Sequence, residues 1–242
     1  MLHKTSGIIL HITKYSETSL IVKIYTGNFG LQSYMINGVR GKKSKMKANL
    51  FQPLALVEMV VSNSNKGNLQ RISEINILHP YTAIPYDMVK SSIAIFLNEI
   101  LYRALQEEHS ENNIFEFIKN SLLILDLKQE NCSNFHIFFM IQLSRYLGFY
   151  PQGKHTPETS IFDLQEGRFI AHTPSIHSHY LTDSYSILLH DFINCSYENI
   201  HQLQLDKNQR KQMLNALIIF YQLHVPSFRE IKSQTILQQV IE

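Results

Sequence analysis

Cysteine is scarce in this chain. Its 242 residues include two cysteines, Cys132 and Cys195, which lie far apart and belong to no Cys-x-x-Cys pair. This scarcity excludes a disulfide-stapled framework and a cysteine-rich zinc site, and it is typical of a reducing compartment.

Long hydrophobic runs are also lacking. No apolar stretch approaches the ~20 residues that span a bilayer, and the short apolar run at the N-terminus is interrupted by His11 and Lys14. A secretory signal needs a longer apolar core. We therefore expect a cytoplasmic protein without a membrane partner.

Sequence motifs for catalysis are missing as well. The chain has no Gly-x-x-x-x-Gly-Lys-Ser/Thr phosphate loop, no His-Glu-x-x-His helix and no Gly-x-Ser-x-Gly turn. These motifs position phosphates, metals and nucleophiles. We expect no enzyme activity and no cofactor, with a metal-dependent nuclease as a distant alternative.

Positive charge is present in excess at one end of the chain. Residues 1–80 carry ten Lys or Arg and three Asp or Glu, a net charge of +7, whereas the remaining 162 residues carry −5. Five cations fall within eight residues of one segment: Arg40, Lys42, Lys43, Lys45 and Lys47. So dense a cluster favours an anionic partner, and the phosphate backbone of a nucleic acid is the commonest one.

The first third of the chain alternates polar and apolar residues with period 2. This pattern predicts strands over 6–13, 19–26, 31–37, 54–62 and 69–78. Five short strands around one long polar loop favour a small Greek-key barrel of the OB type. A five-stranded SH3-like barrel would give almost the same pattern, so the topology stays open.

After residue 80 the hydrophobic period becomes helical. It predicts helices over 88–105, 114–127, 135–147, 185–193, 207–224 and 228–241. Between the third and fourth, residues 160–164 and 167–171 could pair as a small hairpin. We therefore predict an α+β protein of two domains: an OB-type barrel over 1–80 and a helical domain over 81–242, with an insert at 151–180.

Several segments in this order and spacing resemble the RecO family of bacterial recombination mediators. They are Gly7–Leu10, Tyr15–Val22, Asn28–Gly30, Gly38–Arg40 with the basic segment after it, Phe51–Leu54, Tyr146–Pro151, Phe162–Phe169 and Tyr221–His224 with Phe228 and Ile231–Ser233. The resemblance implies an OB barrel joined to a helical domain. It further implies binding of single- and double-stranded DNA, strand annealing, and contact with the C-terminal tail of single-strand-binding protein. With the partner RecR, such proteins help to load a recombinase, so the resemblance implies a nucleoid-associated protein.

Two departures from that family matter. Many members carry four cysteines as a zinc ribbon after the Leu-Gly-Phe-Tyr-Pro stretch, whereas residues 151–180 contain none and present a degenerate, ribbon-like insert. His155, His172, His177 and His179 crowd there, but their spacing matches no common metal site, so we expect exposed loop histidines. Relatives also carry arginines early in the preceding helix, where this chain has His136; this puts in doubt a partner-tail contact there.

The candidate DNA-binding residues begin with the five cations of the segment 40–47. Lys14, Lys23 and Arg71 would extend the basic surface, although ordinary surface cations are an equal alternative. Tyr15 and Tyr34 are candidate platforms for base stacking, with core packing as the alternative, while Phe29 and Phe51 favour core packing. A rival function remains: a protein-interaction scaffold whose basic module binds an acidic tail.

Overall fold

The computed structural model describes residues 2–37, 50–62, 69–105, 111–129 and 131–241. The chain divides into two compact units. Unit 1 comprises Met1–Tyr86 with Leu97–Asp126, and unit 2 comprises Asp87–Phe96 with Leu127–Glu242. This division differs from the boundary predicted after residue 80, because part of α1 (Met88–Ala104) and nearly all of α2 (Asn112–Leu127) group with the strands.

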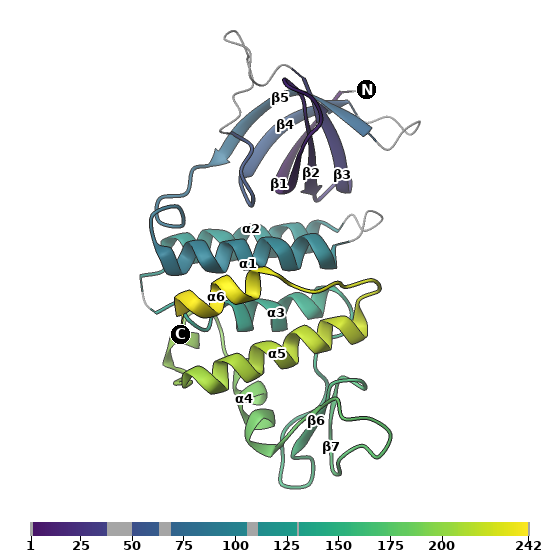
Figure 1. The fold of residues 1–242 in the computed structure, drawn as a ribbon, viewed down its shortest axis with the longest axis vertical. Coiled ribbons are helices and arrows are strands. Elements are labelled where there is room, and N and C mark those ends of the chain that lie inside the picture. Colours follow the sequence, from purple (N-terminus) through teal and green to yellow (C-terminus); the bar gives the residue numbers. More distant parts are fainter. Residues whose placement is uncertain (1, 38–49, 63–68, 106–110, 130, 242) are drawn as a thin grey trace. The chain divides into compact units, whose positions relative to one another are not determined.

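Unit 1 contains the five strands that alternation predicted (Figure 1). They are β1 (Leu2–Lys14), β2 (Leu20–Thr26), β3 (Gly30–Ile36), β4 (Leu56–Ser62) and β5 (Leu69–His79). The strands close into a barrel in the order β1-β2-β3-β5-β4. The long β1 closes it, since its first half pairs with β4 and its second half with β2.

The order of the strands is not a simple meander. β3 pairs with β5 in parallel rather than with β4, and the other pairings are antiparallel. β3 and β4, which follow one another in the sequence, therefore do not pair, and the residues between them include the basic segment.

The interior of the barrel is filled by the inward-facing residues of each strand. It includes Ile9, Val22, Ile24, Tyr34, Ile36, Phe51, Val57, Met59, Val61, Ile72 and Ile75. A Cβ on Gly7 would lie 2.4 Å from Cγ2 of Ile24 and 2.8 Å from Cε of Met59. Atoms cannot approach so closely. At this position of β1, between β2 and β4, a residue without a Cβ is therefore required.

Unit 2 is mainly helical. Its helices are α3 (Phe135–Tyr146), α4 (Asp183–Ile193), α5 (Lys207–His224) and α6 (Ser233–Ile241), with a 3₁₀ turn, η2 (Ile200–Gln202). The start of α5 is fixed by a capping box, in which Asp206 Oδ1 accepts the Gln209 N–H at 2.8 Å and Gln209 Oε1 accepts the Asp206 N–H at 3.0 Å. α6 begins five residues later than predicted, because Ser227 adopts a φ of 59° and Phe228 packs against Tyr221.

A three-stranded sheet interrupts these helices. The predicted hairpin is confirmed as β6 (Ile161–Asp163) paired with β7 (Arg168–Ile170). β8 (Tyr180–Leu181) adds a third strand beside β6, which the sequence did not predict. Asp163 holds the turn, since its Oδ1 accepts the backbone N–H groups of Gln165 at 2.8 Å and Glu166 at 3.0 Å.

Candidate nucleic-acid interface

The five cations of the basic segment, Arg40, Lys42, Lys43, Lys45 and Lys47, lie outside the described residues. The structure describes the strand that precedes this segment in the sequence. β3 ends at Ile36, and the residue before it, Met35, pairs with Arg71 of β5. The end of β3 therefore lies beside another predicted cation.

Lys23 and Arg71 face outward on neighbouring parts of the barrel wall. Lys23 pairs with Ser33 of β3, and Arg71 pairs with Met35 on the same strand. Residues two apart on a strand share a face, and the residues next to Lys23 and Arg71, such as Val22 and Ile72, fill the interior. The two cations therefore share the outer surface, on strands about 10 Å apart with β3 between them.

Lys14 is placed differently. It pairs with Leu20 at the end of β1. Lys14 is on the same, inward-facing side of the strand as Ile12, but it lies beyond the residues that fill the barrel. Lys14 is exposed there, directly before Tyr15 and the β1–β2 turn. Its charge consequently lies at the rim of the barrel and not on the same face as Lys23.

The two predicted stacking tyrosines have opposite environments. Tyr15 is 64% exposed, as a stacking platform requires, whereas Tyr34 is completely buried in the barrel core. The prediction for Tyr34 is therefore wrong, because no base can reach its ring, and burial raises the pKa of its hydroxyl to about 12. Phe51 and Phe29 pack in the core or against it, which confirms the interpretation favoured for them.

A cluster of side chains that the sequence did not indicate lies beside Lys23. The imidazole of His11, which pairs with Lys23, stacks on Tyr102 of α1 with ring centroids 4.7 Å apart and planes at 14°. Lys23 Nζ and Arg103 Cζ lie 5.7 and 5.8 Å from the centroid of the same ring. Some 90 residues separate His11 from Tyr102, so only the fold could reveal this cluster.

The cluster has a distinct electrostatic character. Burial, followed by the charges of Lys23 and Arg103, lowers the pKa of His11 below its ordinary value. Nε of Arg103 is buried and has no hydrogen-bond partner among the described residues. The cluster thus places two permanent cations and one titratable group around a single aromatic ring.

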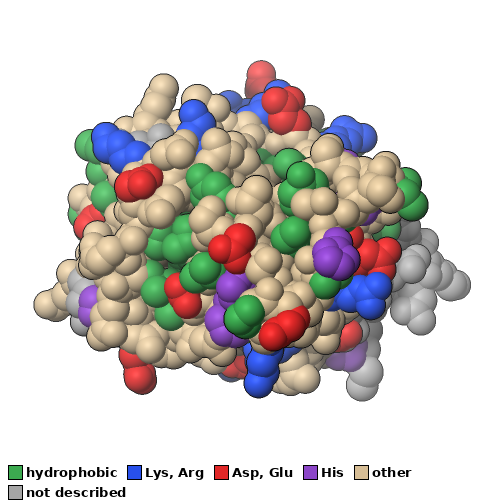
Figure 2. All heavy atoms as spheres, turned by 90° about the horizontal axis from the view of Figure 1, so that it is seen from below, with side chains coloured by type: hydrophobic (Ala, Val, Ile, Leu, Met, Phe, Trp, Pro, Cys, Tyr) green, Lys and Arg blue, Asp and Glu red, His purple; other side chains and the backbone are tan. Residues whose placement is uncertain are grey.

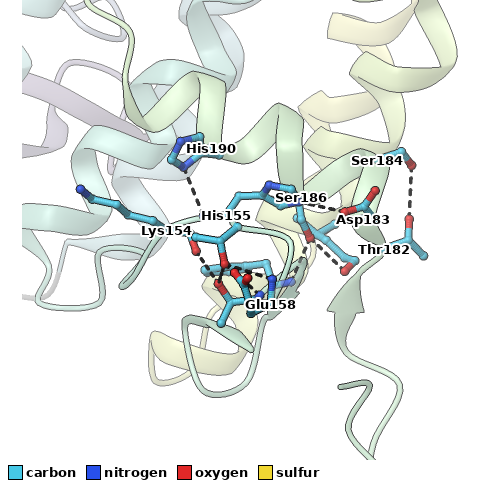
Figure 3. Close-up of polar contacts among 12 residues, drawn as sticks. Lys154, His155, Glu158, Thr182, Asp183, Ser184, Ser186 and His190 are labelled. Carbon is cyan, nitrogen blue, oxygen red and sulfur yellow. Dashed lines mark hydrogen bonds and ion pairs between the residues drawn. The ribbon is translucent and has the colours of Figure 1, made fainter. Parts of the chain in front are cut away.

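Two of the four histidines of the insert contact carboxylates instead of lying free in an exposed loop. His155 Nε2 lies 2.9 Å from Asp183 Oδ1, and the backbone N–H of His155 points at Nδ1 of His190 at 3.5 Å (Figure 3). His177 Nε2 lies 3.5 Å from the buried Oδ2 of Asp163. The expectation of exposed loop histidines is therefore wrong for His155 and His177, because carboxylates hold them in place.

No group of three metal-ligating side chains occurs within the described ranges. Figure 2 shows a face of the molecule on which Lys and Arg, Asp and Glu, and His side chains are interspersed. A face of mixed sign produces a weak net field and is a poor surface for a polyanion. The outer wall of the barrel remains the better candidate.

His136, at the position where the resemblance implied an arginine, is not at the surface. It is 1% exposed in α3, and Nδ1 has no hydrogen-bond partner among the described residues. Burial, with the nearby charge of Arg210, lowers the pKa of His136 to about 3. His136 is thus a neutral core residue, which cannot reach a partner's tail.

Comparison with known proteins places the chain in a class of recombination proteins. The model of the N-terminal region of recombination protein O matches residues 1–81, and that of its C-terminal region matches residues 85–234. The chain belongs to the RecO family.

Individual relatives agree over the full length. The DNA repair protein RecO of Bacteroides fragilis is 37% identical and covers 100% of both chains, and that of Phocaeicola vulgatus is 36% identical over 99% of each. RecO of Flavobacterium psychrophilum is 35% identical over 98% of each. Among solved structures, asparaginyl-tRNA synthetase of Entamoeba histolytica covers 67% of this chain and 36% of its own at 11% identity, with a TM-score of 0.28, too low to inform function.

Within the residues that the structure describes, none of the helices combines the length and apolarity that a bilayer crossing requires.

Proposed function

We propose that this chain is a non-catalytic recombination mediator that binds single- and double-stranded DNA, promotes annealing of complementary strands, and helps a recombinase to load on DNA coated with single-strand-binding protein. Its protein partners would be the C-terminal tail of single-strand-binding protein and RecR. Membership of the RecO family supports this proposal. Annealing needs no covalent chemistry, only neutralised phosphates and bases that remain free to pair.

One observation supports the DNA-binding part: Lys23 and Arg71 share the outer surface of β2, β3 and β5, and the end of β3, which the basic segment follows in the sequence, lies beside Arg71. We assign the barrel to the OB type, since its strand order and the parallel pairing of β3 with β5 give the expected Greek key. OB barrels bind oligonucleotides over strands 2 and 3 and the adjoining loops. Lys23 belongs to that surface, and Tyr15 lies in the loop between β1 and β2.

The proposed mechanism is electrostatic capture of phosphates by the barrel, without readout of the base sequence. Binding that releases counterions weakens with salt, with a log–log slope of about −0.7 per phosphate contact for single strands and about −0.9 for duplexes. Exposed Tyr15 would add stacking to one base of a single strand.

Fluorescence anisotropy with single- and double-stranded oligonucleotides over a series of salt concentrations tests the proposal. Replacing Arg40, Lys42, Lys43, Lys45 and Lys47 with alanine should weaken binding and flatten the salt dependence. The matched control replaces five exposed cations of unit 2 with alanine: Lys154, Lys207, Lys211, Arg229 and Lys232. It removes the same charge and should change the slope much less.

If the two sets of alanine substitutions change DNA affinity and its salt dependence equally, the assignment of DNA binding to the barrel is wrong. A stronger preference for an acidic peptide than for the oligonucleotide would instead favour a protein-interaction scaffold. Cleavage of the oligonucleotide with Mg²⁺ or Mn²⁺ would show that the protein is a nuclease, against the non-catalytic role.

A further inference from the structure

The cluster of His11, Lys23, Tyr102 and Arg103 combines two kinds of nucleic-acid contact in unit 1. Tyr102 and Arg103 lie near the end of α1, in the part of this helix that belongs to unit 1, and the other two residues lie on the paired strands β1 and β2. The stacked rings of His11 and Tyr102 form a double aromatic layer, and His11 is exposed. A base can stack on such a layer, since every base has a π-face.

The charges of the cluster indicate which ligand is needed. The Lys23 and Arg103 cations lie within 6 Å of the Tyr102 ring, and each opposes protonation of His11. Lys23 and Arg103 are both partly exposed, so an anion from solution can approach them. Guanidinium groups suit phosphate oxygens geometrically, and both cations would attract an anion placed here.

We propose that His11, Lys23, Tyr102 and Arg103 form a phosphodiester subsite for a DNA strand, with the phosphate between the cations and the adjacent base stacked on the His11 ring. This subsite rests on the proposed DNA-binding function and extends it from the barrel wall to α1. The combination of a cation pair with an exposed aromatic face favours a nucleotide over an acidic peptide, which offers carboxylates but no planar base.

Two cations elsewhere in unit 1 provide a matched control. Lys119 also lies over an aromatic ring, 5.8 Å from the centroid of Phe115, but it is paired with Glu116 at 2.6 Å. Lys4 is paired with Glu58 at 3.0 Å. The double variants Lys23→Gln/Arg103→Gln and Lys4→Gln/Lys119→Gln each remove two positive charges from the same unit. A difference in their DNA affinity therefore does not come from net charge.

The test measures anisotropy of a labelled single-stranded oligonucleotide from low to moderate salt. The Lys23→Gln/Arg103→Gln variant should bind about tenfold or more weakly and lose about 1.4 from the magnitude of the salt slope, for two phosphate contacts at about 0.7 each. The control should lose less than threefold. Equal losses in the two variants, with binding by the parent intact, would overturn the subsite and leave the proposed function standing.

A second measurement does not depend on the folding of the double variant. Charged groups face His11 from both packed elements: Lys23 from β2, and Arg103, together with the Tyr102 ring, from α1. A bound phosphate raises the pKa of His11, so DNA binding takes up a proton, and affinity rises as pH falls from 7.5 to 5.5. His11→Gln, at an exposed position, should reduce that rise severalfold; an unchanged pH profile would overturn the subsite. If the parent protein binds no oligonucleotide, both proposals are wrong.

Discussion

Thr82 donates two hydrogen bonds to one carboxylate oxygen of Asp126. Its backbone N–H lies 2.9 Å and its hydroxyl 3.0 Å from Oδ2, while the N–H groups of Ala83 and Ile84 reach Oδ1 at 2.8 Å each. A carboxylate near the end of α2 thus holds the segment that follows β5. Burial raises the pKa of Asp126, but these four donors outweigh burial and lower it overall.

Replacing Asp126 with Asn should lower the free energy of unfolding at pH 7 by about 2–4 kcal/mol, because the amide nitrogen would face backbone donors instead of accepting from them. A group with a lowered folded-state pKa stabilises the fold above its unfolded pKa, so this contribution should disappear as pH falls through the folded-state pKa. Urea unfolding measures both effects. In the control Asp87→Asn, where the carboxylate accepts one N–H at 3.0 Å from Lys90, we expect a loss of about 1 kcal/mol or less; an equal loss in both variants would contradict this role of Asp126.

His136 should make unit 2 sensitive to acid. Its folded-state pKa is lowered to about 3 from an ordinary value of 6.5, so between these values the unfolded chain binds the proton and the folded chain does not. The free energy of unfolding should therefore fall on acidification below about pH 6.5, by at most about 1.4 kcal/mol per pH unit from this residue. His136→Leu should flatten that part of the profile; an unchanged slope in urea titrations from pH 6.5 to 4 would rule out the effect.

The insert should be stable without metal. Asp163 holds the β6–β7 turn through two N–H groups and contacts His177, and Asp183 contacts His155. We expect EDTA to leave the thermal unfolding midpoint unchanged. Asp163→Ala, by contrast, should lower the free energy of unfolding by about 0.5–1.5 kcal/mol, because two partly buried N–H groups lose their acceptor. A lower midpoint in EDTA would mean that a bound metal contributes to stability.

The two predicted stacking tyrosines should respond differently to mutation. Tyr15→Ala should weaken binding of single-stranded oligonucleotide by about 1–3 kcal/mol, the usual contribution of one stacked base. Tyr34→Phe should leave binding unchanged, since the ring is buried. It should also be neutral or slightly stabilising, because the Tyr34 hydroxyl has no hydrogen-bond partner among the described residues. Anisotropy and urea unfolding of both variants provide the comparison, and weaker DNA binding by Tyr34→Phe would contradict the core assignment.

Hydrophobic period alone predicted the five strands and the helices of this protein, because side chains on a strand or helix repeat with the geometry of the backbone. Alternation did not distinguish Tyr15 from Tyr34, since both tyrosines suit either a surface or a core position. The sequence placed α2 with the helical domain, whereas the packing of the folded chain groups nearly all of α2 with the barrel strands.

By itself, then, the sequence determined the element types, the concentration of positive charge in the first 80 residues and the family. Only the tertiary structure decided which side chains meet, because strand pairing and packing bring together residues far apart along the chain. His11 and Lys23 became neighbours through the register of β1 and β2, and both met Tyr102 and Arg103 because α1 packs beside those strands. The local pattern of polar and apolar residues does not indicate which distant segments come into contact.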